Sequence, residues 1–262
     1  MMRCCFITLG CRVNQYESDA MAELLTQAGF EITENPAEAD VCIVNTCTVT
    51  NIADRKSRQM LSKAHKLNPN AKLIAAGCFA QRSPEAAAKL EGVYAVLGSA
   101  DKNRVVELVK SIAEGRENEP KSEKCNCGEK ELCDCCGGMK KFEQPENSEC
   151  SGNAAGGAKI LVRDVMHEHE FEEMSAVHEG RTRAYLKIQD GCNMFCTYCA
   201  IPYARGGLRS RSIESVRAEA EKLNNEGFSE VVLTGIHLMS YGRDLRSGTD
   251  IRDAVRCFDG LN

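Results

Sequence analysis

The sequence predicts an α/β protein with an N-terminal parallel, doubly wound sheet, followed by the first units of a partial (β/α) barrel. Three observations support this fold class. Short apolar runs alternate with amphipathic helical patterns through the first 115 residues, and such repeated βα units form parallel sheets. A polar stretch then interrupts the alternation, and new βα units follow it. The predicted divisions are therefore 1–115, 116–178 and 179–262.

The first region contains four apolar runs with the length and composition of buried strands. They are CCFITL at 4–9, VCIVNT at 41–46, KLIAAG at 72–77 and YAVLG at 94–98. Helical patterns lie between these runs. Asn14 and Glu17 have the spacing of a capping box, and the apolar stripe that follows them ends at Gly29. A second stripe stops at Pro69, and Asp101 is the predicted cap of a later helix.

The second region is a linker by composition, because 116–159 is rich in charge and glycine and has almost no large apolar residues. Strand-like character returns at 159–174. A strand at 184–188, a helix capped by Ser212 and a strand at 230–235 then begin the second series. Because a barrel unit takes roughly 30 residues, 179–262 holds two units and the start of a third. We therefore expect the chain to be a fragment.

The composition indicates where in the cell the protein is located and which roles its cysteines have. The chain is 43% hydrophobic and 27% charged, values typical of soluble globular proteins. No apolar run approaches the ~20 residues of a membrane helix, and the N-terminus lacks the apolar core of a signal peptide. The sequence thus predicts a cytoplasmic protein with no membrane partner. Sixteen cysteines in that compartment favour metal or catalytic roles over disulfides.

Charge is distributed unevenly along the chain. The net charge of −5 gives no overall nucleic-acid footprint. Between Arg181 and Arg211, however, six basic residues accompany one acid, Asp190. This pattern indicates either a solvated face or an anionic partner that binds locally.

One set of cysteines follows the predicted strands of the first region. Cys11, Cys47 and Cys78 each come just after the carboxyl end of a strand, beside a small residue or a threonine. Ligands of parallel sheets bind at this edge, so three thiols there can converge on one metal centre. The alternative is three unrelated buried cysteines, which is our interpretation of Cys4, Cys5 and Cys42 inside the strands.

A second set is closely spaced in one loop. Cys192, Cys196 and Cys199 follow a predicted strand with C-x₃-C-x₂-C spacing. This spacing allows one loop to ligate three irons of a [4Fe–4S] cube and leaves the fourth iron open for an exogenous ligand. A zinc site is the competing interpretation, but zinc sites favour paired C-x₂-C units, and no second pair follows downstream.

These motifs carry a family resemblance. C-x₃-C-x-(aromatic)-C, with Tyr198 in the aromatic place, is identified as the signature of radical S-adenosylmethionine (SAM) enzymes. The segments LGCRVNQYES, NTCTVTNIADRKSRQ, AGCFAQ and QDGCNMFCTYCAIPYARGGLRSR resemble the methylthiotransferases, and most of all the tRNA N6-threonylcarbamoyladenosine methylthiotransferases. The resemblance extends over 3–114 and 159–255.

The resemblance implies a site and a chemistry. Cys192, Cys196 and Cys199 would hold a SAM-cleaving [4Fe–4S] cluster, with Tyr198 near the SAM adenine. Cys11, Cys47 and Cys78 would hold an auxiliary [4Fe–4S] cluster. SAM cleavage would yield a radical that abstracts hydrogen from adenine C2 of a modified base next to the tRNA anticodon, and a methylthio group would replace that hydrogen. The implied partners are tRNA and an electron donor of the flavodoxin or ferredoxin type; the sulfur donor is unknown.

By the same resemblance, 1–115 is the N-terminal methylthiotransferase domain, 116–178 a linker with a cysteine-rich insertion and 179–262 the start of the radical SAM core. Family members continue into a complete core and a small β-rich RNA-binding domain, so we expect this chain alone to modify no tRNA. The insertion, with Cys125 to Cys150, departs from the family motifs and is expected to be a disordered loop with incidental metal affinity.

Two other functions remain open at this point. The chain could be a non-catalytic iron–sulfur or metal-binding fragment that carries only electrons or sulfur. It could also belong to a methylthiotransferase that acts on isopentenyladenosine or on a ribosomal-protein aspartate. No catalytic residue beyond the six predicted cluster ligands follows from the sequence.

Overall fold

The computed structural model describes residues 1–115, 157–176 and 182–261. Its main sheet has six parallel strands in the order β2-β1-β3-β4-β5-β6. The strands are β1 (Arg3–Thr8), β2 (Glu31–Ile32), β3 (Val41–Thr46), β4 (Lys72–Gly77), β5 (Val93–Leu97) and β6 (Lys159–Leu161). All carboxyl ends therefore lie at one edge of this sheet.

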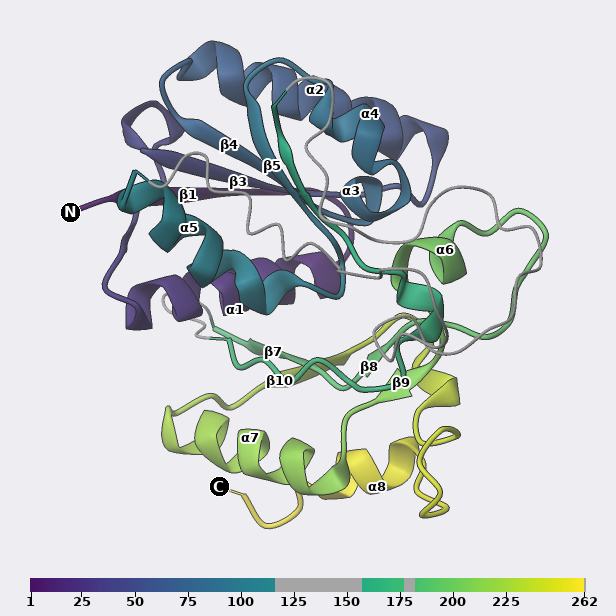
Figure 1. Ribbon diagram of the computed structural model, residues 1–262. Helices are drawn as coiled ribbons and strands as arrows, with labels where there is room; N and C mark the ends of the chain where they lie inside the picture. The colour runs from purple at the N-terminus through teal and green to yellow at the C-terminus, as the bar shows by residue number, and fades with distance from the viewer. Residues whose placement is uncertain (116–156, 177–181, 262) are drawn as a thin grey trace, which may run out of the picture.

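Helices cover both faces of the main sheet. One face packs on α1 (Arg12–Gln27) and α5 (Val105–Ala113), and the other packs on α2 (Asn51–Leu67), α3 (Cys78–Arg82) and α4 (Pro84–Ala88) (Figure 1). Short 3₁₀ turns occur at Pro36–Glu38 (η1) and Lys102–Arg104 (η2). The doubly wound fold predicted from the sequence is confirmed.

A second layer lies below α1 and α5. Strands β7 (Ala184–Lys187) and β10 (Val231–Thr234) form a parallel pair, and β8 (Gln189–Asp190) pairs antiparallel with β9 (Arg209–Ser210). Tyr185 and Val232 pack upward against the core beneath the main sheet. The opposite face of β7 and β10 is covered by α7 (Ile213–Asn225) and α8 (Ile251–Arg256) (Figure 1). The remaining short elements are α6 (Ile201–Arg205), η4 (Val165–His167) and η5 (Leu238–Ser240).

Several predicted elements are confirmed closely. β3 and β4 have the predicted bounds, and Ser212 caps α7 by accepting the Ser215 N–H at 3.2 Å. Gly29 follows the end of α1 with a φ of +88°, a conformation that favours glycine. The sheet also gains β6 from 159–161, so the predicted linker range contains a strand of the main sheet.

One predicted cap is wrong, and the other, Asp101, stands at the N-cap of η2 without a capping hydrogen bond. Cys11, not Asn14, is the N-cap of α1, and the Asn14 and Glu17 side chains are buried and bonded elsewhere. Asp101 has no capping hydrogen bond; its carboxylate instead binds Arg163, with an Nε–Oδ1 distance of 2.7 Å. In both cases a side chain that matched a local pattern is used by a distant partner. No helix of the described residues is long and apolar enough to cross a membrane.

Candidate functional site

The strands bring Cys11, Cys47 and Cys78 to the carboxyl edge of the main sheet. Cys11 is the N-cap of α1, Cys47 follows β3, and Cys78 begins α3 directly after β4. Cys11 is exposed, whereas the other two are buried. The sequence prediction of their placement is confirmed, because parallel strands end at one edge.

The turn that carries Cys11 packs against Cys47. A Cβ at Gly10, which has a φ of +97°, would lie 2.8 Å from Cys47 Sγ, so only glycine allows the Cys11 turn to approach Cys47. Burial raises the pKa of the Cys78 thiol, and Cys11 is close enough to add to that rise. Ser57 fixes the Cys47 backbone by donating to its carbonyl at 2.8 Å and accepting its N–H at 3.1 Å.

Cysteine thiolates are the usual protein ligands of iron–sulfur clusters. Within the described ranges, no three His, Cys, Asp or Glu side chains are grouped closely enough to hold one metal ion. Cys11, Cys47 and Cys78 are the residues that would hold such a cluster at this edge.

The second set of cysteines lies in the loop after β8. Cys192 donates its N–H to the Gly206 carbonyl at 3.1 Å, and Cys199 donates to the Cys196 carbonyl at 2.9 Å. Cys196 is exposed and the other two are partly exposed. Phe195 has a φ of +44°, the only left-handed non-glycine conformation among the residues that the structure describes. A turn of this kind is uncommon outside glycine and marks a constrained loop.

Aromatic side chains surround this loop. Tyr198 is 90% exposed, so the position predicted near the SAM adenine is open to a ligand or to solvent. Phe195 contacts the ring of Tyr203 edge-on, with centroids 6.4 Å apart. The neighbouring loop after β10 is held by Gln189, whose Oε1 accepts the His237 N–H at 2.6 Å.

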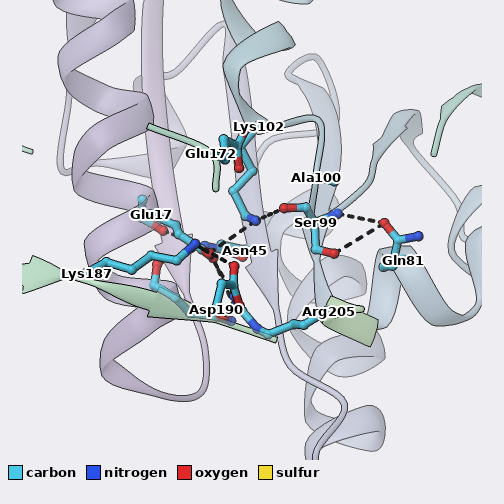
Figure 2. A network of polar contacts seen from close by, with 12 residues as sticks. Glu17, Asn45, Gln81, Ser99, Ala100, Lys102, Glu172, Lys187, Asp190 and Arg205 are labelled. Carbon is cyan, nitrogen blue, oxygen red and sulfur yellow. Dashed lines mark hydrogen bonds and ion pairs between the residues drawn. The ribbon is translucent and has the colours of Figure 1, made fainter. Parts of the chain in front are cut away.

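A buried polar network connects the two layers (Figure 2). It contains four cations and two carboxylates, all at most 5% exposed: Lys102, Lys187, Arg205, Arg209, Glu17 and Asp190. Glu17 comes from α1 and Lys102 from η2, whereas the others come from β7, β8, α6 and β9. The network thus joins the first region of the chain to the third.

Arg205 is the centre of the network. Its guanidinium donates to both Glu17 oxygens at 2.8 and 3.1 Å, to Asp190 at 3.1 Å and to Asn14 Oδ1 at 2.5 Å. Lys187 completes the arrangement, because its Nζ lies 2.7 Å from Glu17 Oε1 and 2.6 Å from Asp190 Oδ2. The planar Arg205 guanidinium contacts Glu17 at two points, which fixes this carboxylate in both position and orientation.

Electrostatics keep both carboxylates ionised. Burial alone would raise the pKa of Glu17, but the three cations around it outweigh burial and hold its pKa far below the ordinary value. The pKa of Asp190 is lowered in the same way, with Lys187 and Arg205 opposing burial. Burial would lower the pKa of Lys187, but Asp190 and Glu17 raise it above its usual range.

The network corrects the interpretation of the basic stretch between 181 and 211. Arg205, Arg209 and Arg211 are neither solvated nor available to phosphate, since each is at most 5% exposed. Arg211 binds Glu173 at 2.9 Å and Glu219 at 3.3 Å. The sequence did contain a signal that Glu17, the partner of Arg205, is buried. Glu17 lies four residues before Met21 and therefore shares the apolar stripe of α1.

The other singled-out residues lie away from both sets. Cys5 and Cys42 are register partners on β1 and β3, and both are buried in the core with Cys4. Cys257 is also buried. His167 and His169 are exposed. The cysteines from 125 to 150 lie outside the described residues.

Comparisons with known proteins agree with both halves of the site. Residues 3–98 match the model of "Uncharacterized protein family UPF0004", and residues 186–245 match "Radical SAM superfamily". The chain is 38% identical over 242 residues to threonylcarbamoyladenosine tRNA methylthiotransferase MtaB of Bacillus subtilis, covering 92% of this chain and 45% of that protein. The chain is thus similar to methylthiotransferases over nearly its whole length, and its third region is similar to the radical SAM superfamily. Enzymes of the radical SAM family use SAM and a [4Fe–4S] cluster.

Other similarities define the limits of this assignment. The chain is 32% identical to ribosomal protein uS12 methylthiotransferase RimO of Chloroflexus aurantiacus, over 91% of this chain and 47% of that protein. The radical SAM methyltransferase TsrM of Kitasatospora setae shares the fold, with a TM-score of 0.55 and 16% identity over 98% of this chain and 50% of that one. The chain spans about half the length of the curated relatives it matches.

Proposed function

We propose that the protein to which this chain belongs transfers a methylthio group to C2 of N6-threonylcarbamoyladenosine in tRNA. The observation that carries the proposal is the presence of two separate cysteine trios, one at the carboxyl edge of the main sheet and one in the loop after β8. Cys192, Cys196 and Cys199 would hold the SAM-binding [4Fe–4S] cluster, and Cys11, Cys47 and Cys78 a second one. The first cluster would supply the electron for reductive SAM cleavage, delivered by a flavodoxin or ferredoxin type donor in the cytoplasm.

This chain's own residues have supporting roles in that proposal. Gly191 and Gly206 allow the cluster loop to fold tightly, and Gln189 holds the neighbouring loop against it. Tyr198 is positioned as an exposed ring on which an adenine can stack. Arg205 holds α6, which follows the cluster loop, against α1 through Glu17 and Asn14.

The experiment that tests the function has two readouts. After anaerobic cluster reconstitution, the chain is expected to convert SAM to 5′-deoxyadenosine with dithionite as reductant, and Cys192→Ala is expected to abolish this. Cys11→Ala is expected to leave SAM cleavage intact. Absence of SAM cleavage in the fully reconstituted chain would favour the alternative of a non-catalytic iron–sulfur fragment.

The substrate is identified separately. In cells that express the complete gene, mass spectrometry of tRNA nucleosides is expected to show the methylthio derivative of N6-threonylcarbamoyladenosine. The relationship to RimO makes uS12 the second candidate substrate, and a methylthio group on uS12, or on isopentenyladenosine instead, would contradict the proposed substrate.

A basic surface on α2 supports a nucleic-acid partner. Five basic residues occupy the exposed side of this helix: Arg55, Lys56, Arg58, Lys63 and Lys66. The single acid of α2, Asp54, is partly buried and binds Arg82 and Thr48. α2 begins four residues after Cys47, so its basic side leads away from the edge that carries the thiols. Sequence reasoning placed the basic surface at 181–211 instead.

Removing this charge is expected to weaken tRNA binding. A variant with Arg55, Lys63 and Lys66 changed to glutamine should bind an unmodified tRNA transcript more weakly at low salt, with a salt slope shallower by about 1 for each phosphate that the variant no longer neutralises. Fluorescence anisotropy over a salt series measures both effects. The matched control changes Lys110, Arg252 and Arg256, which lie on α5 and α8. Equal weakening in the two variants would show that net charge alone is responsible.

A further inference from the structure

One buried amide joins two of the turns that carry cysteines at the carboxyl edge of the main sheet. Asn14 is wholly buried, and its Nδ2 donates to the Leu9 carbonyl at 2.8 Å and to the Thr46 carbonyl at 2.9 Å. Leu9 lies two residues before Cys11, and the Thr46 carbonyl belongs to the peptide bond that enters Cys47. The Asn14 side chain therefore connects the turn after β1 to the turn after β3.

Thr46 extends this connection to the third turn. Gly77 is the N-cap of α3 and has no side chain with which to cap it. The Thr46 Oγ1 accepts the Ala80 N–H at 3.3 Å, in the place where an N-cap side chain normally accepts, and donates to the Ala76 carbonyl at 2.5 Å. Because α3 begins with Cys78, the neighbouring strand β3 supplies the cap of the helix that carries the third thiol.

Arg205 fixes the direction in which the Asn14 amide points. The Asn14 Oδ1 accepts from Arg205 Nη2 at 2.5 Å. A guanidinium has donors only, so the amide oxygen must face Arg205 and its two hydrogens must face the Leu9 and Thr46 carbonyls. Arg205 is itself held by both Glu17 oxygens and ends α6. The amide thus has one permitted orientation, in which its oxygen and both of its hydrogens have partners.

This amide contributes geometry rather than bulk. A hydrogen bond in the interior gains little net stability, whereas a donor left unpaired there is costly. An apolar side chain would fill the same space without that risk. What Asn14 adds is a fixed separation, because its short bonds to two carbonyls hold the turns after β1 and β3 against each other.

The two cysteine sets differ in their need for such a contact. The three cysteines of the loop after β8 are close in sequence, so one loop positions all of them. Cys11, Cys47 and Cys78 come from separate turns, each after a different strand. The ladder hydrogen bonds of the sheet end at the strands, so contacts between the turns decide the separation beyond that point. Groups behind metal ligands commonly orient them in this way.

We propose that Asn14 is a positioning residue for the [4Fe–4S] cluster at Cys11, Cys47 and Cys78. The proposal rests on the second cluster of the proposed function. Asn14 acts through the backbone that carries the ligands, and the Thr46 hydroxyl acts in the same way on the third turn. Loss of either group is therefore expected to weaken iron binding while all three thiols remain in the chain.

The test removes one donor from an otherwise intact site. The parent carries alanine in place of the three cysteines of the loop after β8, so that only the other set can hold a cluster. In this parent, Asn14→Asp keeps the size of the side chain and the acceptor for Arg205, but it places an oxygen against the Leu9 and Thr46 carbonyls. The reconstituted variant is expected to bind iron about 10–100-fold more weakly in competition with a ferrous chelator. Iron that remains when the cysteines of all three turns are also changed to alanine is subtracted as background.

Thr46→Val tests the same arrangement without a new charge. Valine keeps the size and the β-branch of threonine but lacks the hydroxyl that caps α3. It is expected to weaken iron binding in the same direction, and it serves as the test if Asn14→Asp does not fold.

The matched control is Asn68→Asp, at the other edge of the main sheet. Asn68 lies four residues before β4, and its Nδ2 donates to the carbonyls of Pro36, Ala37 and Ala39 at 3.2, 3.2 and 2.8 Å. The change removes an amide donor from backbone carbonyls, as Asn14→Asp does, but far from the thiols. It is expected to lower the stability of the iron-free chain to urea and to leave iron binding equal to that of the parent.

Each outcome is decisive. Iron binding equal to that of the parent in both Asn14→Asp and Thr46→Val would overturn the positioning role and leave the second cluster standing. Equal loss of iron in Asn68→Asp and Asn14→Asp would overturn it as well, because the loss would follow general destabilisation. If the parent binds no iron above background, both this proposal and the second cluster of the proposed function fail.

Discussion

Glu17→Gln is expected to lower the free energy of unfolding by about 3–5 kcal/mol, the usual cost of removing one partner of a buried ion pair. Glu17 is wholly buried, and its carboxylate forms ion pairs with three cations, Arg205, Lys187 and Lys102. Glutamine keeps the shape of the side chain but leaves those cations with less compensation. Urea unfolding followed by circular dichroism measures the change.

The matched control is Glu107→Gln on α5. Glu107 is 75% exposed and pairs with the partly exposed Arg104 at 3.6 Å, so its removal is expected to cost less than 1 kcal/mol, roughly the value of a surface ion pair. Similar losses in the two variants would contradict the central position assigned to Glu17.

The pH dependence of the free energy of unfolding tests the contribution of Glu17 independently. Because the pKa of Glu17 is lower in the folded protein than in the unfolded chain, its contribution to stability is complete above its ordinary pKa and is lost as pH falls toward the folded value. The wild-type chain should therefore lose stability progressively as pH falls below the ordinary glutamate range. Glu17→Gln should show a flatter dependence in that window.

Gly191→Ala is expected to have the second large effect, on the loop that holds Cys192. Gly191 has a φ of +67°, and a Cβ there would lie 1.7 Å from the Gly207 carbonyl oxygen. Left-handed backbone costs a residue with a side chain roughly 1–2 kcal/mol, and the clash adds a displacement of the Gly207 backbone. We expect the reconstituted variant to lose most of the iron bound at Cys192, Cys196 and Cys199.

Gly227→Ala separates the cost of the left-handed backbone from the cost of the clash with Gly207. Gly227 has a φ of +87°, but no atom of the described residues lies within 4 Å of a built Cβ, so alanine there is expected to cost only the backbone term. Iron analysis and urea unfolding are compared for the two variants. If Gly191→Ala binds as much iron as Gly227→Ala, the close approach of Gly191 to Gly207 does not position the loop.

The sequence allowed the main sheet to be predicted well because its signals are local. The continuous apolar runs at 41–46 and 72–77 become β3 and β4 at the same residues, since strands buried on both faces need no partner pattern to be recognised. The strand-end position of Cys11, Cys47 and Cys78 followed from the same reasoning. Their role as cluster ligands remains a prediction.

The network could not be predicted in the same way. Glu17 and Arg205 are 188 residues apart, and the pairing that explains both residues is invisible in either local pattern. Asn14 matched a capping box, yet its amide donates to the Leu9 carbonyl at 2.8 Å and the Thr46 carbonyl at 2.9 Å. The short strand β2 and helix α3 were also missed, because elements of two to five residues carry no clear period.

The contact of Arg205 with Asn14 and Glu17 also bears on how such proteins can be recombined. The two matched families, UPF0004 and radical SAM, meet through side chains that each half must supply in complementary form. A chimera that joins the first half of this chain to the second half of a relative inherits one side of a buried charge arrangement without its counterpart. The halves are thus better exchanged as a pair, although each matches a family model of its own.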